Sequence, residues 1–273
     1  MLMFRVSNFI KNYTLSDNHH AFEVLLLLEN LSKGTKKHRR LNEDSPEEHS
    51  SIQIDSGTNL DLKINQLKHA IKKDPYNADA YYDLGEIARA RKEHNTALNY
   101  YKTVINIDNS YGLAHARLGE CYSNMGDLDN AITHYHKVLS LYPDDEITHY
   151  ELGKIFWEKE EYEMALSHFE YSSGNVEAKP EIHFYMASCY NALENFSFAI
   201  QRYEKALGIN PFYTAAHLGL AEVYLHLDKL DKAEYHTQKA QELDDTSPEP
   251  LINLGLIAIK KEQFDRAIDY FNK

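Results

Sequence analysis

The stretch HARLGECYSNMGDLDNAITHYHKVLSLYP at residues 115–143 decides the fold of this 273-residue chain. It holds two segments with apolar residues at helical spacing, separated by a polar break at residues 125–127. Pro143 ends the second segment, and proline cannot continue a helix. The stretch therefore predicts two short helices joined by a tight turn.

The same pattern returns every 34 residues along most of the chain. One alanine of the second helix recurs as Ala97, Ala131, Ala165, Ala199, Ala233 and Ala267. Four residues later come Tyr101, Tyr135, Phe169, Tyr203, Thr237 and Phe271. A small residue of the first helix recurs as Gly85, Gly119, Gly153, Ala187, Ala221 and Gly255. We expect the two helices of each unit to approach closely at the small residues, with the aromatic ring filling the space beside them.

This pattern resembles the tetratricopeptide repeat family, whose 34-residue unit reads Trp-x2-Leu-Gly-x2-Tyr, then Ala-x3-Phe, then Pro. The resemblance implies an all-α fold, a right-handed α-solenoid of stacked helix-turn-helix units. It divides the repeat region into a leading second helix at 58–77, five repeats at 78–111, 112–145, 146–179, 180–213 and 214–247, and an incomplete repeat at 248–273.

Two repeats depart from the family pattern. The third has Ser172-Ser173-Gly174-Asn175 where apolar residues are expected, which predicts a shortened helix and an irregularity at 172–179. The last repeat stops inside its second helix without a polar capping helix, which solenoid ends normally need. We therefore expect the natural chain to continue beyond Lys273.

Residues 1–57 stand apart from the repeats. Asn18 to Leu31 predict one helix, with Leu25, Leu28 and Leu31 on a shared face, and residues 33–57 predict a polar linker. Lys36–Arg40 resembles a nuclear localisation signal, although a solvated linker is the favoured interpretation. The solvated-linker interpretation and the low cysteine count favour the cytoplasm. If Lys36–Arg40 acts as a localisation signal, the nucleus is the alternative.

Charge and composition exclude several classes of partner. The chain carries 42 acidic and 29 basic side chains, a net charge of −13, which has the wrong sign for nucleic acid or an anionic membrane surface. The longest apolar run, Val24–Leu28, is far shorter than the roughly 18 residues of a membrane-spanning helix. Cys121 and Cys189 lie two repeats apart, so we expect both to be free and buried.

The sequence predicts no enzyme activity, cofactor or metal site. It contains no nucleotide-binding loop, no Gly-x-Ser-x-Gly and no His-Glu-x-x-His. Two histidine series recur with the repeat, His115, His149, His183 and His217, and then His134, His168 and His236. Members of one series are separated by whole helices about 8–10 Å apart, whereas metal ligands share a point at about 2 Å. We therefore interpret the histidines as packing residues.

The resemblance implies that the first helix of each repeat lines a concave groove through positions 2, 5, 9, 12 and 13 of the repeat. Tyr150, Lys154, Trp157 and Phe184 are expected to meet near the middle of this groove, flanked by glutamates. Aromatic anchors surrounded by charge suit a peptide or helix partner. The candidate partner-binding residues are Tyr82, Glu86, Arg89, Glu120, Tyr150, Lys154, Trp157, Phe184 and Glu222.

Three functions remain open from the sequence. The first is a non-catalytic adaptor or scaffold, alone or as a subunit of a larger complex, binding a segment with basic and apolar residues. The second is the substrate-recruiting region of an enzyme whose catalytic domain is missing from this chain. The third is a structural protein that self-associates through its open C-terminal edge. Chaperone-tail binding is disfavoured, because the Lys and Asn of the family's carboxylate clamp are replaced by pairs such as Tyr82 and Glu86.

Overall fold

The computed structural model describes residues 57–172 and 179–273, which form two compact units. Both units are all-helical, and the described residues contain no strand. The expected N-terminal helix, the linker with Lys36–Arg40 and most of the expected irregularity after Ser172 lie outside the described residues.

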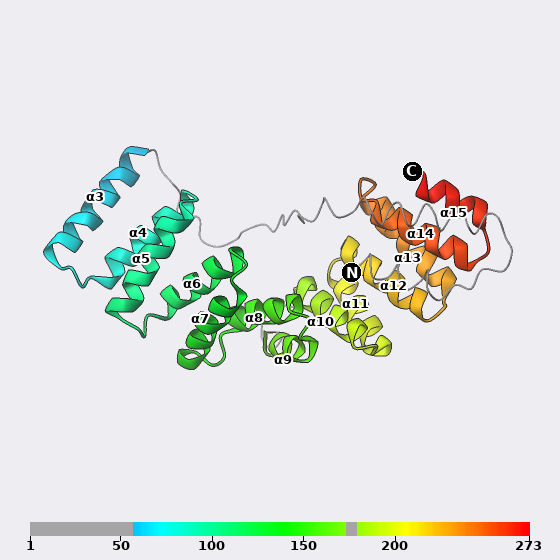
Figure 1. Ribbon diagram of the computed structural model, residues 1–273, viewed down its shortest axis with the longest axis horizontal. Coiled ribbons are helices and arrows are strands. Elements are labelled where there is room, and N and C mark those ends of the chain that lie inside the picture. The colour runs from blue at the N-terminus through cyan, green and yellow to red at the C-terminus, as the bar shows by residue number, and fades with distance from the viewer. Residues whose placement is uncertain (1–56, 173–178) are drawn as a thin grey trace. The chain divides into compact units, whose positions relative to one another are not determined.

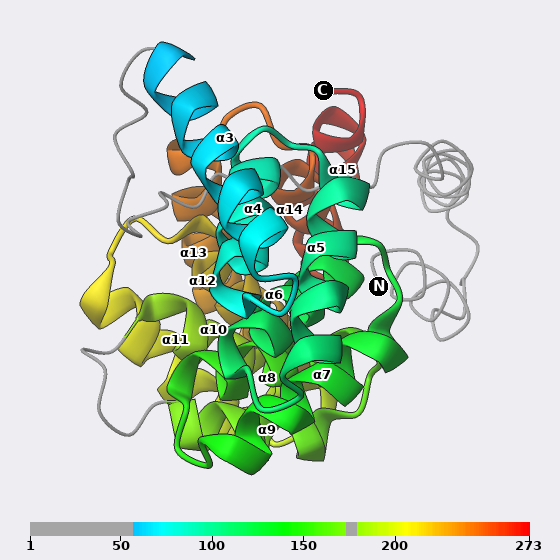
Figure 2. The same cartoon turned by 90° about the vertical axis from the view of Figure 1, so that its left-hand side faces the viewer.

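The unit of residues 57–172 is a series of helices in which each packs on the next (Figures 1 and 2). It begins with a leading helix, α3, which starts at Gly57, one residue before the 58–77 stretch expected for it, and ends at Lys73. Its helices are α3 (Gly57–Lys73), α4 (Ala78–Ala90), α5 (His94–Ile107), α6 (Gly112–Asn124), α7 (Leu128–Leu141), α8 (Glu146–Glu158) and α9 (Tyr162–Ser172).

The unit of residues 179–273 repeats the same hairpin three times. Its helices are α10 (Pro180–Ala192), α11 (Phe196–Ile209), α12 (Thr214–His226), α13 (Leu230–Leu243), α14 (Glu249–Lys260) and α15 (Phe264–Phe271). Within the unit the first helices also contact one another, α10 with α12 and α12 with α14.

Local signals place the helix boundaries. The side chains of Asn77, Asp127 and Asp145 accept hydrogen bonds from backbone N–H groups in the first turns of α4, α7 and α8. A left-handed residue stands in the turn inside each hairpin, again at intervals of 34: Lys92, Gly126, Glu160, Glu194, Asp228 and Glu262. This turn reverses the chain within two or three residues, so α7 begins at Leu128, directly after the predicted polar break at 125–127, and α9 begins at Tyr162.

The small residues of the first helices receive the aromatic rings of the second helices. A Cβ atom added at Gly85, Gly119 or Gly153 would lie 2.5–2.6 Å from the ring of Tyr101, Tyr135 or Phe169, respectively. At each of these glycines, the backbone of the first helix therefore contacts the aromatic ring of the second helix. The alanines four residues earlier, such as Ala131 and Ala165, are fully buried, as expected.

Two expectations are only partly met. Helix α9 has 11 residues where α5, α7, α11 and α13 each have 14, in agreement with a shortened helix in the third repeat.

Both cysteines are free, and Cys189 is buried, but the prediction that Cys121 is buried is wrong, since it is half-exposed. Cys121 follows Glu120 on α6 and lies near the charged side chains of Arg89 and Arg117.

Candidate partner-binding face

Positions 5, 9 and 12 of each repeat lie on one face of its first helix, because residues spaced by four and three share a helix face. We call this the first-helix face. On α4 it consists of Tyr82, Glu86 and Arg89, and on α8 of Tyr150, Lys154 and Trp157. All six side chains are half-buried, so each packs against neighbours and still presents atoms to solvent.

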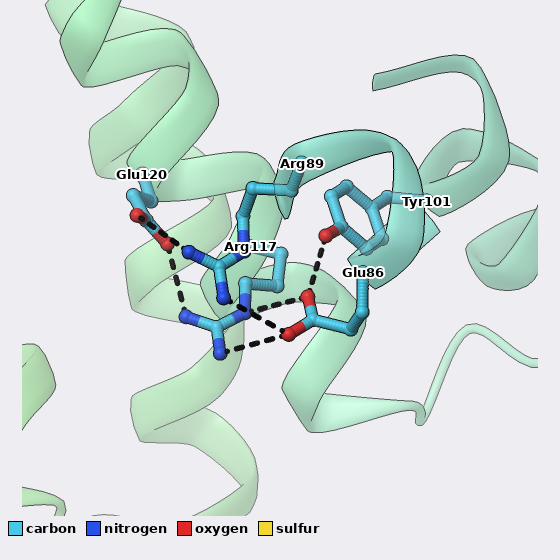
Figure 3. A network of polar contacts seen from close by, with 5 residues as sticks. All are labelled: Glu86, Arg89, Tyr101, Arg117 and Glu120. Carbon is cyan, nitrogen blue, oxygen red and sulfur yellow. Dashed lines mark hydrogen bonds and ion pairs between the residues drawn. The ribbon is translucent and has the colours of Figure 1, made fainter. Parts of the chain in front are cut away.

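A network of charged side chains occupies this face on α4 and α6 (Figure 3). The Glu86 carboxylate accepts hydrogen bonds from Arg117 Nε at 2.9 Å and Nη2 at 3.2 Å, and from Arg89 Nη2 at 3.2 Å. The hydroxyl of Tyr101, on α5, donates to the same carboxylate at 2.5 Å. Arg117 Nη1 also donates to Glu120 at 3.0 Å. Two arginines and two glutamates thus neutralise one another across adjacent repeats.

Glu86 is the centre of this network. Burial alone would raise the pKa of its carboxyl, but the hydrogen bonds from Tyr101 and Arg89 and the charge of Arg117 outweigh it, and the pKa is lowered. Burial and the bond to Glu86 raise the pKa of Tyr101. The carboxylate is therefore held ionised, with its lone pairs already taken by donors of this chain. Glu86 and Glu120 are thus paired with arginines of this chain, and their predicted contact with a partner stays a prediction.

The face of α8 combines aromatic rings with one cation. Lys154 Nζ lies 5.5 Å from the ring centroid of Tyr150 and 3.5 Å from the Glu151 carboxylate. The ring of Tyr150 also lies 6.1 Å from that of Phe169, on α9. The ring of Tyr150 is therefore held in place by its contact with Phe169. Trp157 lies two turns along the same face and is half-buried. A supported ring with a half-exposed neighbour is suited to accept an apolar side chain.

The remaining predicted residues, Phe184 and Glu222, belong to the other unit. The ring centroid of Phe184 lies 5.9 Å from that of Tyr203, on α11, and 5.4 Å from that of Tyr213, which precedes α12. Phe184 therefore packs against the second helix of its own hairpin and against the turn before the next hairpin. Glu222 lies 3.9 Å from His226 on the same helix. The expected meeting of Phe184 with Tyr150 and Trp157 spans both units and stays a prediction.

Sequence reasoning missed Arg117. It occupies position 6 of its repeat, outside the positions that the resemblance assigns to the groove, and lies 31 residues from Glu86 in sequence. A charged residue one turn from Glu120 on the same helix was the available signal. Its pairing with a carboxylate of the preceding repeat depends on how α4 and α6 pack.

The two histidine series pair with each other in three of the hairpins, which sequence reasoning also missed. Nδ1 of the first-helix histidine lies 3.0 Å from Nδ1 of the second-helix histidine in His115–His134, His149–His168 and His217–His236. Nε2 of each first-helix histidine faces a backbone carbonyl, at Asn109, Pro143 or Pro211. Because a carbonyl only accepts, the first-helix ring carries its proton on Nε2, and its Nδ1 accepts from the second-helix ring.

The fourth repeat breaks this series. His183 is only 2% exposed, and its two ring nitrogens have no hydrogen-bond partner among the described residues. Arg202 stands where the other three repeats have the second histidine. Burial and the nearby charges of Lys205 and Arg202 lower the pKa of His183 to about 4. His183 is therefore a neutral, buried ring in the described unit.

Paired histidines raise the question of a metal site. Across residues 57–172 and 179–273, no group of three or more His, Cys, Asp or Glu side chains is placed to hold a metal ion. The 3.0 Å separation of the Nδ1 atoms is that of a hydrogen bond. Among the same residues, every helix is too short or too polar to cross a membrane.

Comparison with known families assigns the repeat. Models described as tetratricopeptide repeat match residues 67–99, 112–145, 190–235 and 248–273, which together cover more than half of the chain. The family's small residue and aromatic residue fall on the packed pairs described above, such as Gly119 and Tyr135. No curated protein matches the chain.

Solved structures show the same fold. The type IV pilus biogenesis factor PilW is 18% identical, with a TM-score of 0.62 over 71% of this chain and 90% of its own. YrrB, described as a TPR protein with an unusual peptide-binding site, is 19% identical, with a TM-score of 0.63 over 69% and 97%. Residues 41 to the end of MamA from Desulfovibrio magneticus RS-1 are 23% identical, with a TM-score of 0.59 over 62% and 96%. At these identities the likeness concerns the fold, and with the family matches it leads to one conclusion: the chain belongs to the tetratricopeptide repeat family of protein-interaction scaffolds.

Proposed function

We propose that the protein is a non-catalytic adaptor that binds an extended or helical segment of a partner protein on the first-helix face, with the α8 residues Tyr150 and Trp157 as anchors. The observation that carries this is the pair of half-buried large aromatic side chains on one face of α8, with the ring of Tyr150 packed against that of Phe169. Aromatic anchors of this kind dominate binding energy at protein interfaces. YrrB, which has a peptide-binding site on the same fold, supports the same class of activity.

The partner segment carries an apolar anchor together with basic residues. Tyr150 and Trp157 supply the apolar contact, and the chain's net charge of −13 favours encounter with a basic partner. The glutamates Glu86 and Glu120 contribute little to this selection, because Arg89 and Arg117 already pair with them. We place the protein in the cytoplasm, in keeping with two free cysteines in the described residues.

Affinity capture with matched variants tests the proposal. The full chain, a Tyr150→Ala/Trp157→Ala variant and a Tyr76→Ala/Phe212→Ala control serve as baits in native lysate, and captured proteins are identified by mass spectrometry. Tyr76 and Phe212 are 78% and 74% exposed and lie in turns away from the first-helix face, so the control removes two large aromatic side chains elsewhere.

A partner that the wild type and the control capture and the α8 variant loses supports the proposal. The purified partner should then bind the α8 variant at least about tenfold more weakly by calorimetry, the effect of losing an anchor worth about 1.4 kcal/mol or more. Equal capture by all three baits would place the binding surface elsewhere and contradict it. Circular dichroism of each bait confirms that the helices are intact.

A further inference from the structure

The turn between α7 and α8 departs from the other turns that join one repeat to the next. In the other four described turns, an Asp or Asn side chain accepts a hydrogen bond of 2.8–3.0 Å from the backbone N–H two residues further on; these residues are Asp74, Asp108, Asn210 and Asp244. Tyr142 occupies the same position of the repeat, and a tyrosine ring cannot make this local bond. The side chain is also 56% exposed, so burial of the ring does not explain the exchange.

The ring of Tyr142 is held against the first residue of α6. A Cβ atom added at Gly112 would collide with the ring, and Gly112 is the only glycine at its position among the repeats. The turn itself is fixed by two hydrogen bonds. The N–H of Asp145 donates to the carbonyl of Tyr142 at 3.2 Å, and Nε2 of His149 donates to the carbonyl of Pro143 at 3.0 Å. The exposed ring is therefore already in place before any partner binds, which lowers the entropic cost of binding.

Two further apolar side chains are exposed at the same junction of α6, α7 and α8. Leu113 follows Gly112 on α6, and Ile147 follows the turn on α8; they are 62% and 61% exposed. Both occupy position 2 of the repeat, where the other repeats have an acid or alanine, at Asp79, Glu181, Ala215 and Glu249. Single exposed apolar residues are ordinary, whereas apolar residues gathered in one place mark an interaction site. We call Leu113, Tyr142 and Ile147 the turn-edge patch.

The charge beside the turn-edge patch is negative. The turn contains Asp144, Asp145 and Glu146 and neither Lys nor Arg. Asp144 and Glu146 form no ion pair with any residue of 57–172 or 179–273, and Asp145 accepts only the uncharged N–H of Thr148, at 2.8 Å. The glutamates of the α4 and α6 network, by contrast, are neutralised by arginines. Apolar surface beside uncompensated negative charge is complementary to apolar side chains beside Lys or Arg.

We propose that the turn-edge patch docks a basic amphipathic segment of another protein. Large apolar side chains of the segment pack on Leu113, Tyr142 and Ile147, and its Lys or Arg side chains lie beside Asp144 and Glu146. The departures from the repeat pattern carry this inference, since residues that break a local rule in one place tend to serve function there. Tyr142 lies in a turn, outside the first-helix face, so the surface is additional to Tyr150 and Trp157 and does not depend on the partner proposed for them.

Peptide selection on the full chain tests the patch. The probe is a phage-displayed library of random 12-residue peptides, selected on the wild type, and the selected peptides are then synthesised and measured by fluorescence polarisation. The patch variant is Leu113→Ala/Tyr142→Asn/Ile147→Ala, which removes apolar surface and leaves the charge unchanged. Its new residue types are ones that the repeat already has at these positions, at Ala215 and Asn210. Asparagine also accepts the turn N–H, as Asn210 does, so the fold should be retained, which circular dichroism checks.

A class of selected peptides with Lys or Arg beside large apolar residues should bind the patch variant at least about tenfold more weakly than the wild type. The same peptides should bind Tyr150→Ala/Trp157→Ala as tightly as the wild type. Asp144→Asn/Glu146→Gln should weaken them about threefold or more at low salt, because the attraction to their basic residues is lost. Asp265→Asn/Asp269→Asn is the matched control: it removes two exposed acids of the other unit and should have no effect.

Three results would overturn the proposal. The first is that every selected peptide binds the patch variant as tightly as the wild type. The second is that the peptides lost by the patch variant lack basic residues, or lose affinity equally in the two acid variants. The third is a wild-type dimer in light scattering that the patch variant converts to a monomer, since a second copy would then be the occupant. Because Tyr150→Ala/Trp157→Ala is measured separately, a failure here leaves the α8 proposal standing, and a failure of partner capture leaves this one standing.

Discussion

His168 on α9 donates its Nδ1–H to Nδ1 of His149 on α8, with the two nitrogens 3.0 Å apart. The donor assignment follows from the carbonyl of Pro143, which faces Nε2 of His149 at 3.0 Å and so requires the proton there. The ring of Phe156 stacks on His168 with centroids 5.3 Å apart, and that of Tyr171 stacks on His149 at 4.6 Å. The same pair recurs in two other hairpins. In all three, a hydrogen bond between two imidazole rings connects the first helix to the second.

The histidine pairs predict that the protein loses stability as the pH falls from about 7 to about 4. Burial first, and then the partner histidine, lower the pKa of His134, His168 and His236 to about 4, against about 6.5 in the unfolded chain. Between the folded and the unfolded pKa, the unfolded chain binds more protons than the folded chain. The free energy of unfolding therefore decreases on acidification through this range and levels off below the folded pKa. Each broken pair should cost about 1 kcal/mol, the value of one hydrogen bond.

Thermal melts at pH 7, 6 and 5 measure this effect. The comparison is the triple variant His134→Asn/His168→Asn/His236→Asn, since the asparagine amide N–H₂ can replace the Nδ1–H donor and does not titrate. Its melting temperature should fall less steeply with pH than that of the wild type. Parallel curves for the two proteins would show that the pairs do not govern the acid response.

Arg202→His should create the fourth histidine pair. It places a ring with a donor opposite His183, whose nitrogens lack partners among the described residues. One new buried hydrogen bond should raise the free energy of unfolding by about 1 kcal/mol, measured by urea denaturation at pH 8. Arg202→Gln is the control, because it removes the same charge with an amide on a flexible chain. If both variants shift the midpoint equally, charge removal and not the pair accounts for the gain.

Glu86→Gln should destabilise the protein by about 1–2 kcal/mol at pH 7, because half-buried Arg89 and Arg117 lose their shared counter-charge. The side chain of Glu86 is 19% exposed and that of Glu120 is 39% exposed. Glu120→Gln therefore serves as the matched control and should cost less than about 0.5 kcal/mol. Chemical denaturation with urea measures both, and an equal cost would mean that Glu86 is not the centre of the network.

Gly153→Ala and Gly208→Ala should have opposite effects on stability. A Cβ at Gly153 would lie 2.6 Å from the ring of Phe169, so the ring must move, at a cost of about 1–3 kcal/mol. At Gly208, near the end of α11, the added Cβ meets nothing within 4 Å. There the better helix propensity of alanine should add up to about 1 kcal/mol. Thermal melts of the two single variants test this, and Phe169→Leu in the Gly153→Ala background should recover part of the loss.

Partner capture complements these stability measurements. Tyr150 and Trp157 test what the first-helix face binds. Glu86 and Glu120 are not part of that test, because their charges are paired with Arg89 and Arg117.

Much of the fold could be predicted because its signals are local. Caps, turns and prolines act over a few residues and recur with the 34-residue repeat, so α7 begins at Leu128, directly after the predicted polar break at 125–127. The candidate face could be predicted only through the family resemblance. For α8 the side chains share a half-exposed face, as helix periodicity requires.

The sequence by itself therefore determined the helices, their order and the residues that repeat on each face, since these depend on spacing along the chain. Only the tertiary structure decided which side chains meet. His149 finds His168 nineteen residues away, and Glu86 finds Arg117 thirty-one residues away. Such contacts depend on how far two helices are rotated and offset against each other, and a repeat length alone does not specify that geometry.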